Sequence, residues 1–189
     1  SLSFIAKILE KKGLQKIYLN NEVPLHKSTS DLEHESFTIK KNSKYHEIIS
    51  QHIDETKKRY NLNIIFAYPI FHPSDKNYFD LKNNPNFYKF FPMGKEKCNL
   101  NFIVHSNLFE IDASRREFLQ EHELNKIILS KLSEELIIRL SNYQLKDEKK
   151  YRNIYLSILS SGRPPADQVW IKETLYDPLK EYIKGNVPT

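Results

Sequence analysis

The chain has 189 residues, a formal net charge of +5 and a single cysteine, Cys98. This length suits one domain, with or without a helical appendage, and one cysteine excludes an internal disulfide. The modest charge is compatible with an anionic partner but does not establish one, because lysines and acids are interleaved in most segments. The sequence has no apolar window of about eighteen residues and no secretory signal, so we expect a cytoplasmic protein with no membrane partner.

The N-terminal part of the chain predicts two strands separated by a polar segment. Residues 14–19 alternate between apolar and polar side chains as a strand does, and they follow a turn at Gly13. Residues 37–40 resemble a second strand. The polar residues 20–36 between them indicate a loop or an irregular hairpin.

The next part of the chain predicts a charged helix and three further strands. Residues 44–60 place their apolar side chains on one helical face, and residues 62–70 form the continuous apolar run that is typical of a central strand. A turn is expected at residues 71–75. Residues 87–91 and 101–105 predict two more strands, joined by a turn that contains proline and glycine.

From residue 121 onward the pattern becomes helical. Residues 124–140 carry apolar side chains at helical spacing. Residues 148–160 predict a second helix, and a Gly-Arg-Pro-Pro break precedes a third helix over residues 168–184. The side chains expected to face inward on the second helix are Tyr151, Ile154, Tyr155, Ile158 and Leu159.

Together these patterns predict an α+β fold, with a small mixed or antiparallel sheet and helices, followed by a C-terminal helical region. We expect residues 1–120 to form the α+β region and residues 121–189 to form a helical region packed on it. The chain begins with Ser1 rather than Met and neither end carries a helix cap, so we expect a fragment of a longer polypeptide.

Glycine is scarce, and this limits the chemistry of the chain. The glycines are four isolated residues, Gly13, Gly94, Gly162 and Gly185. Phosphate-cradling loops need several glycines close together, because backbone N–H groups must approach the ligand. No such loop is present, so the main pocket for any nucleotide is expected to lie outside this chain.

The segment of residues 102–118 carries the most informative pattern. It contains a short buried strand, a second apolar run and a polar turn that ends in Arg115 and Arg116, before a long amphipathic helix. Two adjacent guanidiniums between packed elements suit bidentate recognition of a phosphate or a carboxylate. The alternative is that both arginines are solvated surface charges or form a salt bridge at the start of the helix.

Other catalytic patterns have simpler explanations. No group of His, Cys, Asp or Glu has the spacing of a metal site. Cys98 and His105 could form a nucleophilic dyad, but the residues between them predict a strand without an activating helix start. Glu110 and Asp112 share a face of an extended segment, and a salt bridge to one of the arginines explains them as well as a nuclease site does.

Several short motifs, in order, resemble sacsin-like proteins, whose ATPase module is related to the ninety-kilodalton heat-shock chaperone and belongs to the gyrase, chaperone and histidine-kinase ATPase superfamily. The motifs are Phe90-Phe91-Pro92, the strand of residues 100–105 that ends in His105, the aromatic-to-arginine segment 109–116, and Leu124-Asn125. Residues 3–5, 17–19 and 65–69 also resemble strands of that family, so the likeness spans residues 1–145. The His105-to-Phe109 spacing is one residue longer than usual, and Ser106-Asn107 replaces the usual small and acidic pair.

The resemblance implies a middle, transducer-like segment that follows an ATP-binding domain of the same polypeptide. In such proteins this segment supplies a basic residue to the terminal phosphate, whereas ATP and Mg²⁺ are bound mainly by the preceding domain. By this analogy the residues that contact nucleotide are Arg115, with Arg116 as the second candidate, and His105. The resemblance also implies that the chain alone has no activity and that ATP hydrolysis belongs to the full-length protein.

A different hypothesis makes the chain a non-catalytic binding module for a partner protein or nucleic acid. The C-terminal helices could present an aromatic surface, with Lys149, Lys150 and Arg152 contacting phosphates. Both hypotheses leave open whether the further partner is a protein client or a nucleic acid.

Overall fold

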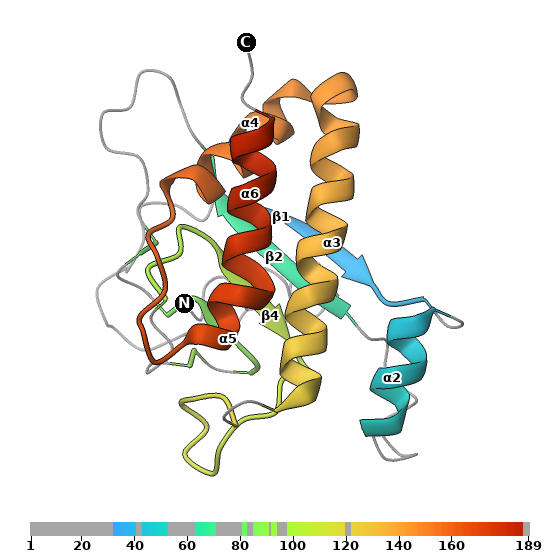
Figure 1. Ribbon diagram of the computed structural model, residues 1–189, viewed down its shortest axis with the longest axis vertical. Helices are drawn as coiled ribbons and strands as arrows, with labels where there is room; N and C mark the ends of the chain where they lie inside the picture. Colours follow the sequence, from blue (N-terminus) through green and yellow to red (C-terminus); the bar gives the residue numbers. More distant parts are fainter. Residues whose placement is uncertain are drawn as a thin grey trace, which may run out of the picture.

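The computed structural model describes residues 32–40, 43–52, 63–70, 81–82, 85–90, 92–93, 98–119 and 122–186 (Figure 1). The strand expected at residues 14–19, the turn at 71–75 and the second half of the 44–60 helix lie outside these residues. In the part that is described, a four-stranded sheet is followed by a set of C-terminal helices, which confirms the predicted α+β fold.

The sheet is mixed and has the strand order β1-β2-β4-β3. Strands β1 (Leu32–Thr38), β2 (Asn63–Pro69) and β4 (Ile103–Ser106) are antiparallel neighbours, whereas β3 (Phe87–Tyr88) runs parallel to β4. The two strands expected at residues 87–91 and 101–105 are therefore adjacent but do not form a hairpin. The parallel pairing brings Phe87 opposite Val104 and Tyr88 opposite His105.

Strand β2 is buried from Ile64 to Pro69, because both faces of the sheet are covered there. Ile64, Phe66 and Tyr68 belong to the main core under the helices, whereas Ile65 and Ala67 belong to a smaller cluster on the opposite face. The prediction of a central strand over residues 62–70 is thereby confirmed.

The assignment of residues 20–36 to a loop is wrong for residues 32–36, which form most of β1. This part of the strand was not predicted because it consists mainly of polar and charged residues, including Glu33 and Glu35. Both carboxylates have partners on the helices, so their polarity does not oppose burial of the strand.

The helices are α2 (Lys44–His52), α3 (Glu123–Lys146), α4 (Glu148–Ser160), α5 (Val169–Ile171), the π-helix η3 (Lys172–Tyr176) and α6 (Asp177–Gly185). Asp147 separates α3 from α4 and accepts a hydrogen bond from the backbone N–H of Lys150, which caps α4. The predicted second helix has the observed bounds, but its Leu159 is 49% exposed, so the expectation that Leu159 faces inward is wrong.

Helices α3, α4 and α6 pack against one another, and Figure 1 shows them on one face of the sheet. Every fourth residue of α3 from Leu124 to Leu140 is fully buried, and the main core continues through β1, β2 and β4 to α6. The sheet and the C-terminal helices therefore share one core. Within the described residues, no helix is long and apolar enough to cross a membrane.

Candidate functional site

Residues 110–119 form a closed turn between β4 and α3. Its two sides are joined by an isolated bridge between Ile111 and Phe118, and the backbone N–H of Leu119 donates to the carbonyl oxygen of Glu110 at 3.0 Å. Asn125, in the first turn of α3, fixes the base: its Oδ1 accepts from the N–H of Glu110 and its Nδ2 donates to the Glu110 carbonyl, both at 2.8 Å. The Asn125 side chain is fully buried, so it ties the turn firmly to the helix.

Asp112 organises the tip of this turn. Its carboxylate accepts hydrogen bonds from the backbone N–H groups of Ser114, Arg116 and Glu117, at 3.0, 3.3 and 3.4 Å. A hydrogen bond from the Ser114 side chain, together with these backbone bonds, holds the pKa of Asp112 below its usual value. Asp112 thus acts on the backbone of the turn.

Arg115 lies at the tip of the turn in the left-handed backbone region, with a φ of 60°. This conformation is unfavourable for a residue with a Cβ atom, and the surrounding turn has to hold it. The N–H of Arg115 donates to the carbonyl oxygen of Asp112 at 3.0 Å, and the residue is exposed. Arg116 is also exposed. The two arginines precede α3 by several residues, so they are presented by a turn and not by the helix itself.

A surface cavity of about 460 Å³ lies beside this turn. One wall is formed by Ile111, Asp112, Ala113 and Arg115, and the other by Lys89 and Phe90, which follow β3. Phe90 is 61% exposed. The cavity therefore combines an arginine and a lysine with apolar side chains, and this composition suits an anionic group.

Both walls rest on one cluster of aromatic rings. Phe118 contacts Phe87, Phe109 and Trp170 edge to face, with 5.0 Å between ring centroids in each pair. Phe87 lies two residues before Lys89, and Phe109 and Phe118 flank the turn of Arg115. Trp170 belongs to α5, directly before the π-helix. Edge-to-face contacts of buried rings fix relative positions well, so the two cavity walls are held in a defined arrangement.

The other residues predicted for the site lie apart from this cavity. His105 is on β4, beside Tyr88 and Ile65, and it shares the sheet face of Ile103, away from the main core. Cys98 is buried, and its Sγ donates to Oε1 of Gln168 at 2.6 Å, which accounts for the thiol without a dyad. Among the described residues, no group of three or more His, Cys, Asp or Glu side chains could hold a metal ion.

The sequence predicted Arg115 as a candidate but did not indicate that Lys89 and Phe90 line the same cavity. The Lys89-Phe90 segment was expected to be part of a strand, whereas β3 ends at Tyr88. The sequence does show a lysine and an aromatic residue directly after a short apolar run. This pattern does not indicate that they lie beside the turn of Arg115.

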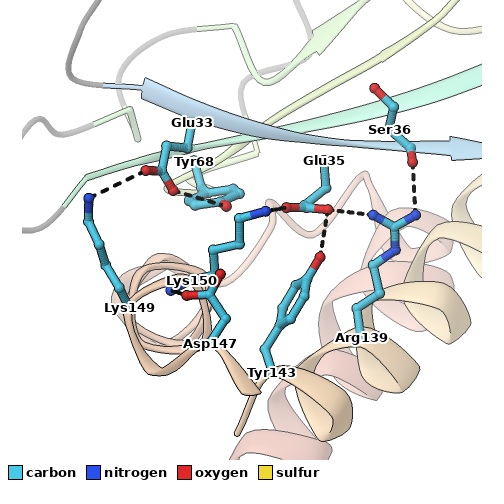
Figure 2. Close-up of polar contacts among 9 residues, drawn as sticks. All are labelled: Glu33, Glu35, Ser36, Tyr68, Arg139, Tyr143, Asp147, Lys149 and Lys150. Carbon is cyan, nitrogen blue, oxygen red and sulfur yellow. Dashed lines mark hydrogen bonds and ion pairs between the residues drawn. The ribbon is translucent and has the colours of Figure 1, made fainter. Parts of the chain in front are cut away.

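A second polar cluster connects β1 to α3 and α4 (Figure 2). Glu35, only 5% exposed, contacts the Arg139 guanidinium, accepts a hydrogen bond from the Tyr143 hydroxyl at 2.9 Å and lies 3.3 Å from Lys150 Nζ. Arg139 also donates to the carbonyl oxygen of Ser36 at 2.9 Å. The Glu35 charge raises the pKa of Lys150, and burial followed by Glu35 raises the pKa of Tyr143.

The neighbouring carboxylate extends this cluster along β1. Glu33 accepts a hydrogen bond from the Tyr68 hydroxyl at 3.3 Å and lies 3.8 Å from Lys149 Nζ. Burial, and then the charges of Glu35 and Glu33, raise the pKa of Tyr68 well above its usual value. Glu33 and Glu35 each have a positively charged partner on the helices. We therefore interpret this cluster as a structural link between β1 and the helices.

Comparisons with protein-family models, with curated proteins and with solved structures gave no match. The mixed sheet and its helices place the chain in the α+β class, and the arginine-bearing turn is its candidate site. The function has to be argued from that turn and from the motif resemblance.

Proposed function

We propose that this chain is the transducer-like middle segment of a sacsin-like, chaperone-related ATP-dependent protein. In this proposal Arg115 contacts the terminal phosphate of a nucleotide that a preceding ATP-binding domain holds. The observation that carries it is an exposed guanidinium at the tip of a turn that is fixed at both ends. A residue presented in this way can reach a ligand bound by another domain.

The backbone of the turn supports this role because it positions the arginine before any ligand arrives. The side chains of Asp112 and Asn125 accept hydrogen bonds from backbone N–H groups of the turn, and these bonds hold its conformation. A fixed backbone lowers the entropy that the turn loses on contact, and a guanidinium at its tip can stabilise the charge that develops during phosphoryl transfer. ATP and Mg²⁺ would be held mainly outside this chain, which agrees with its four isolated glycines.

Arg116 and His105 differ in whether they can contact the phosphate. Arg116 is one residue from Arg115 and equally exposed, so it remains the second candidate for the phosphate contact. His105 lies on β4 and does not line the cavity of Arg115. We therefore assign it no direct contact with nucleotide.

The alternative function, a binding module for a partner protein or nucleic acid, uses Lys149, Lys150 and Arg152. Two of these three cations are close to carboxylates of β1, Lys149 to Glu33 and Lys150 to Glu35. Cations already paired with acids gain less from a phosphate contact, because the existing pair must be broken. This observation favours the nucleotide-linked proposal. Salt-dependent DNA binding by the chain, lost on replacing these three cations, would favour the alternative instead.

The test measures ATP turnover in a longer protein that includes the ATP-binding domain. We expect Arg115→Ala to lower turnover by about a hundred-fold or more, since guanidiniums that stabilise a transferring phosphoryl group have effects of this size. The chain of 189 residues by itself should not hydrolyse ATP.

The matched control is Arg152→Ala, which removes an exposed arginine from α4. This variant should retain full turnover. Arg116→Ala should cost less than Arg115→Ala if the phosphate contact belongs to Arg115. Unchanged turnover in Arg115→Ala would contradict the proposed function.

A further inference from the structure

Lys89 is the second positively charged residue at the cavity of Arg115. It follows β3, whereas Arg115 comes from the turn after β4, and the parallel pairing of these two strands brings the segments together. Asp112 also lines the cavity, but its carboxylate is engaged by backbone N–H groups of its own turn. The lining thus carries two cations and one anion.

We propose that this cavity is a phosphate subsite in which Lys89 and Arg115 contact the same terminal phosphate group. The proposal rests on the proposed function and deepens it, because it names the ligand group and adds a second residue that binds it. Arg115 supplies a planar fork suited to two phosphate oxygens, and Lys89 supplies a compact charge for a third. A terminal phosphate carries more charge than one guanidinium neutralises, so a second cation completes its recognition.

The apolar part of the lining bounds the cavity beside both cations. Phe90, Ile111 and Ala113 line the cavity beside the two cations. Phe90 and Ala113 are exposed, so the cavity is open to water and these side chains shape it without shielding it. The cavity volume of about 460 Å³ falls in the range of small-ligand sites, so a phosphate group and the adjoining part of the nucleotide can enter.

The aromatic cluster makes the two cations act together. Phe87, two residues before Lys89, contacts Phe118 at 5.0 Å between centroids, and Phe118 closes the turn of Arg115 through its bridge to Ile111. The walls are therefore fixed to each other before a ligand binds. Preorganisation of this kind favours affinity, because little conformational entropy is lost on binding.

The experiment titrates the 189-residue chain with pyrophosphate, which represents the two terminal phosphates of a nucleotide, and measures affinity by calorimetry. Backbone amide NMR shifts of Phe90 and Ala113 report on the cavity itself. We expect saturable binding that weakens with salt, and a loss of roughly ten-fold in affinity for each of Lys89→Gln and Arg115→Gln. Lys146→Gln, at the far end of α3, is the matched control and should bind as the unchanged chain does.

Tricarballylate, a carboxylate compound of similar charge, distinguishes phosphate recognition from general attraction of anions. It should bind at least roughly ten-fold more weakly than pyrophosphate. Equal affinity for the two ligands, or wild-type affinity in Lys89→Gln, would overturn the phosphate subsite.

Turnover in the longer protein separates this inference from the proposed function. If Arg115→Ala abolishes turnover and Lys89→Gln does not change it, the role of Lys89 is wrong and the proposed function stands. If pyrophosphate binds in the cavity and Arg115→Ala leaves turnover unchanged, the phosphate subsite stands and its link to ATP hydrolysis is wrong.

Discussion

Arg115 combines exposure with a backbone conformation that favours glycine, and this combination permits a test of the turn that is independent of any ligand. A side chain with a Cβ atom costs about 1 kcal/mol or more in the left-handed region, and a β-branched side chain costs more still. We expect Arg115→Gly to be at least as stable as the unchanged chain, because relief of this strain offsets the added entropy of the unfolded state.

The companion variant is Arg115→Val, which we expect to be less stable than Arg115→Gly by about 1 to 2 kcal/mol. Denaturant unfolding followed by circular dichroism measures both. Equal stabilities would mean that the positive φ of residue 115 is not kept in solution. Both variants should lose pyrophosphate affinity, so a stable but non-binding Arg115→Gly separates folding from recognition.

Only some residues of the candidate site could be predicted from the sequence. Arg115 could be identified because a polar turn with adjacent arginines follows a buried strand. Asp112 was interpreted as a possible salt-bridge partner, and a one-dimensional pattern does not show that its oxygens accept backbone N–H groups. Lys89 lies 26 residues before Arg115, and only the parallel pairing of β3 with β4 makes the two residues neighbours.

Among the elements, β1 depends on the carboxylate of Glu35 for its attachment to α3 and α4. We expect Glu35→Ala to destabilise the chain by about 2 kcal/mol. Arg139, Tyr143 and Lys150 then lose the buried carboxylate with which they interact. The matched control is Glu33→Ala on the same strand. Its side chain is 29% exposed and its lysine partner is 71% exposed, so it should cost less than about 1 kcal/mol. Urea unfolding of the two variants checks the difference, and equal losses would contradict a special role for Glu35.

The same strand shows why some elements could be predicted and others could not. Strand β2 and helix α4 could be found because their apolar residues have the expected spacing and their ends carry ordinary breaking or capping residues. Of strand β1 only the end at Phe37 and Thr38 was predicted, because the inward-facing Glu35 reads as polar surface until Arg139 and Lys150 are known to meet it. The interruption of the last helix by a π-helix over Lys172–Tyr176 also left no mark in the periodicity.

For the molecule as a whole, buried tyrosines set the response of stability to alkaline pH. Burial raises the pKa of Tyr88 to about 12, and it also raises the pKa values of Tyr45 and Tyr68 far above their usual value near 10. Above pH 10 the unfolded chain therefore loses tyrosine protons that the folded chain retains. This stabilisation is fully present below about pH 10 and is lost as the pH rises through the folded pKa values.

We therefore expect the free energy of unfolding to fall between about pH 10 and pH 12, by about 1.4 kcal/mol per pH unit for each such tyrosine. Lys180, whose pKa is lowered by burial, acts in the opposite direction, but only below its usual pKa of 10.5. Thermal unfolding across this range, with tyrosinate absorbance as a second signal, measures the effect. Tyr88→Phe should reduce the slope, and a slope unchanged by that substitution would contradict the assignment to Tyr88.

Helix α3 is held at two separated points. Asn125 ties one end to the turn of Arg115, and Arg139 ties a point fourteen residues further on to Glu35 of β1. These residues are about 21 Å apart along the axis. Between these two points the helix is packed along its length, since every fourth residue from Leu124 to Leu140 is fully buried, so it acts as a rigid spacer between β1 and the turn. One helix therefore sets the distance between the attachment of β1 and the arginine-bearing turn, and the position of Arg115 depends on contacts far from it in the sequence.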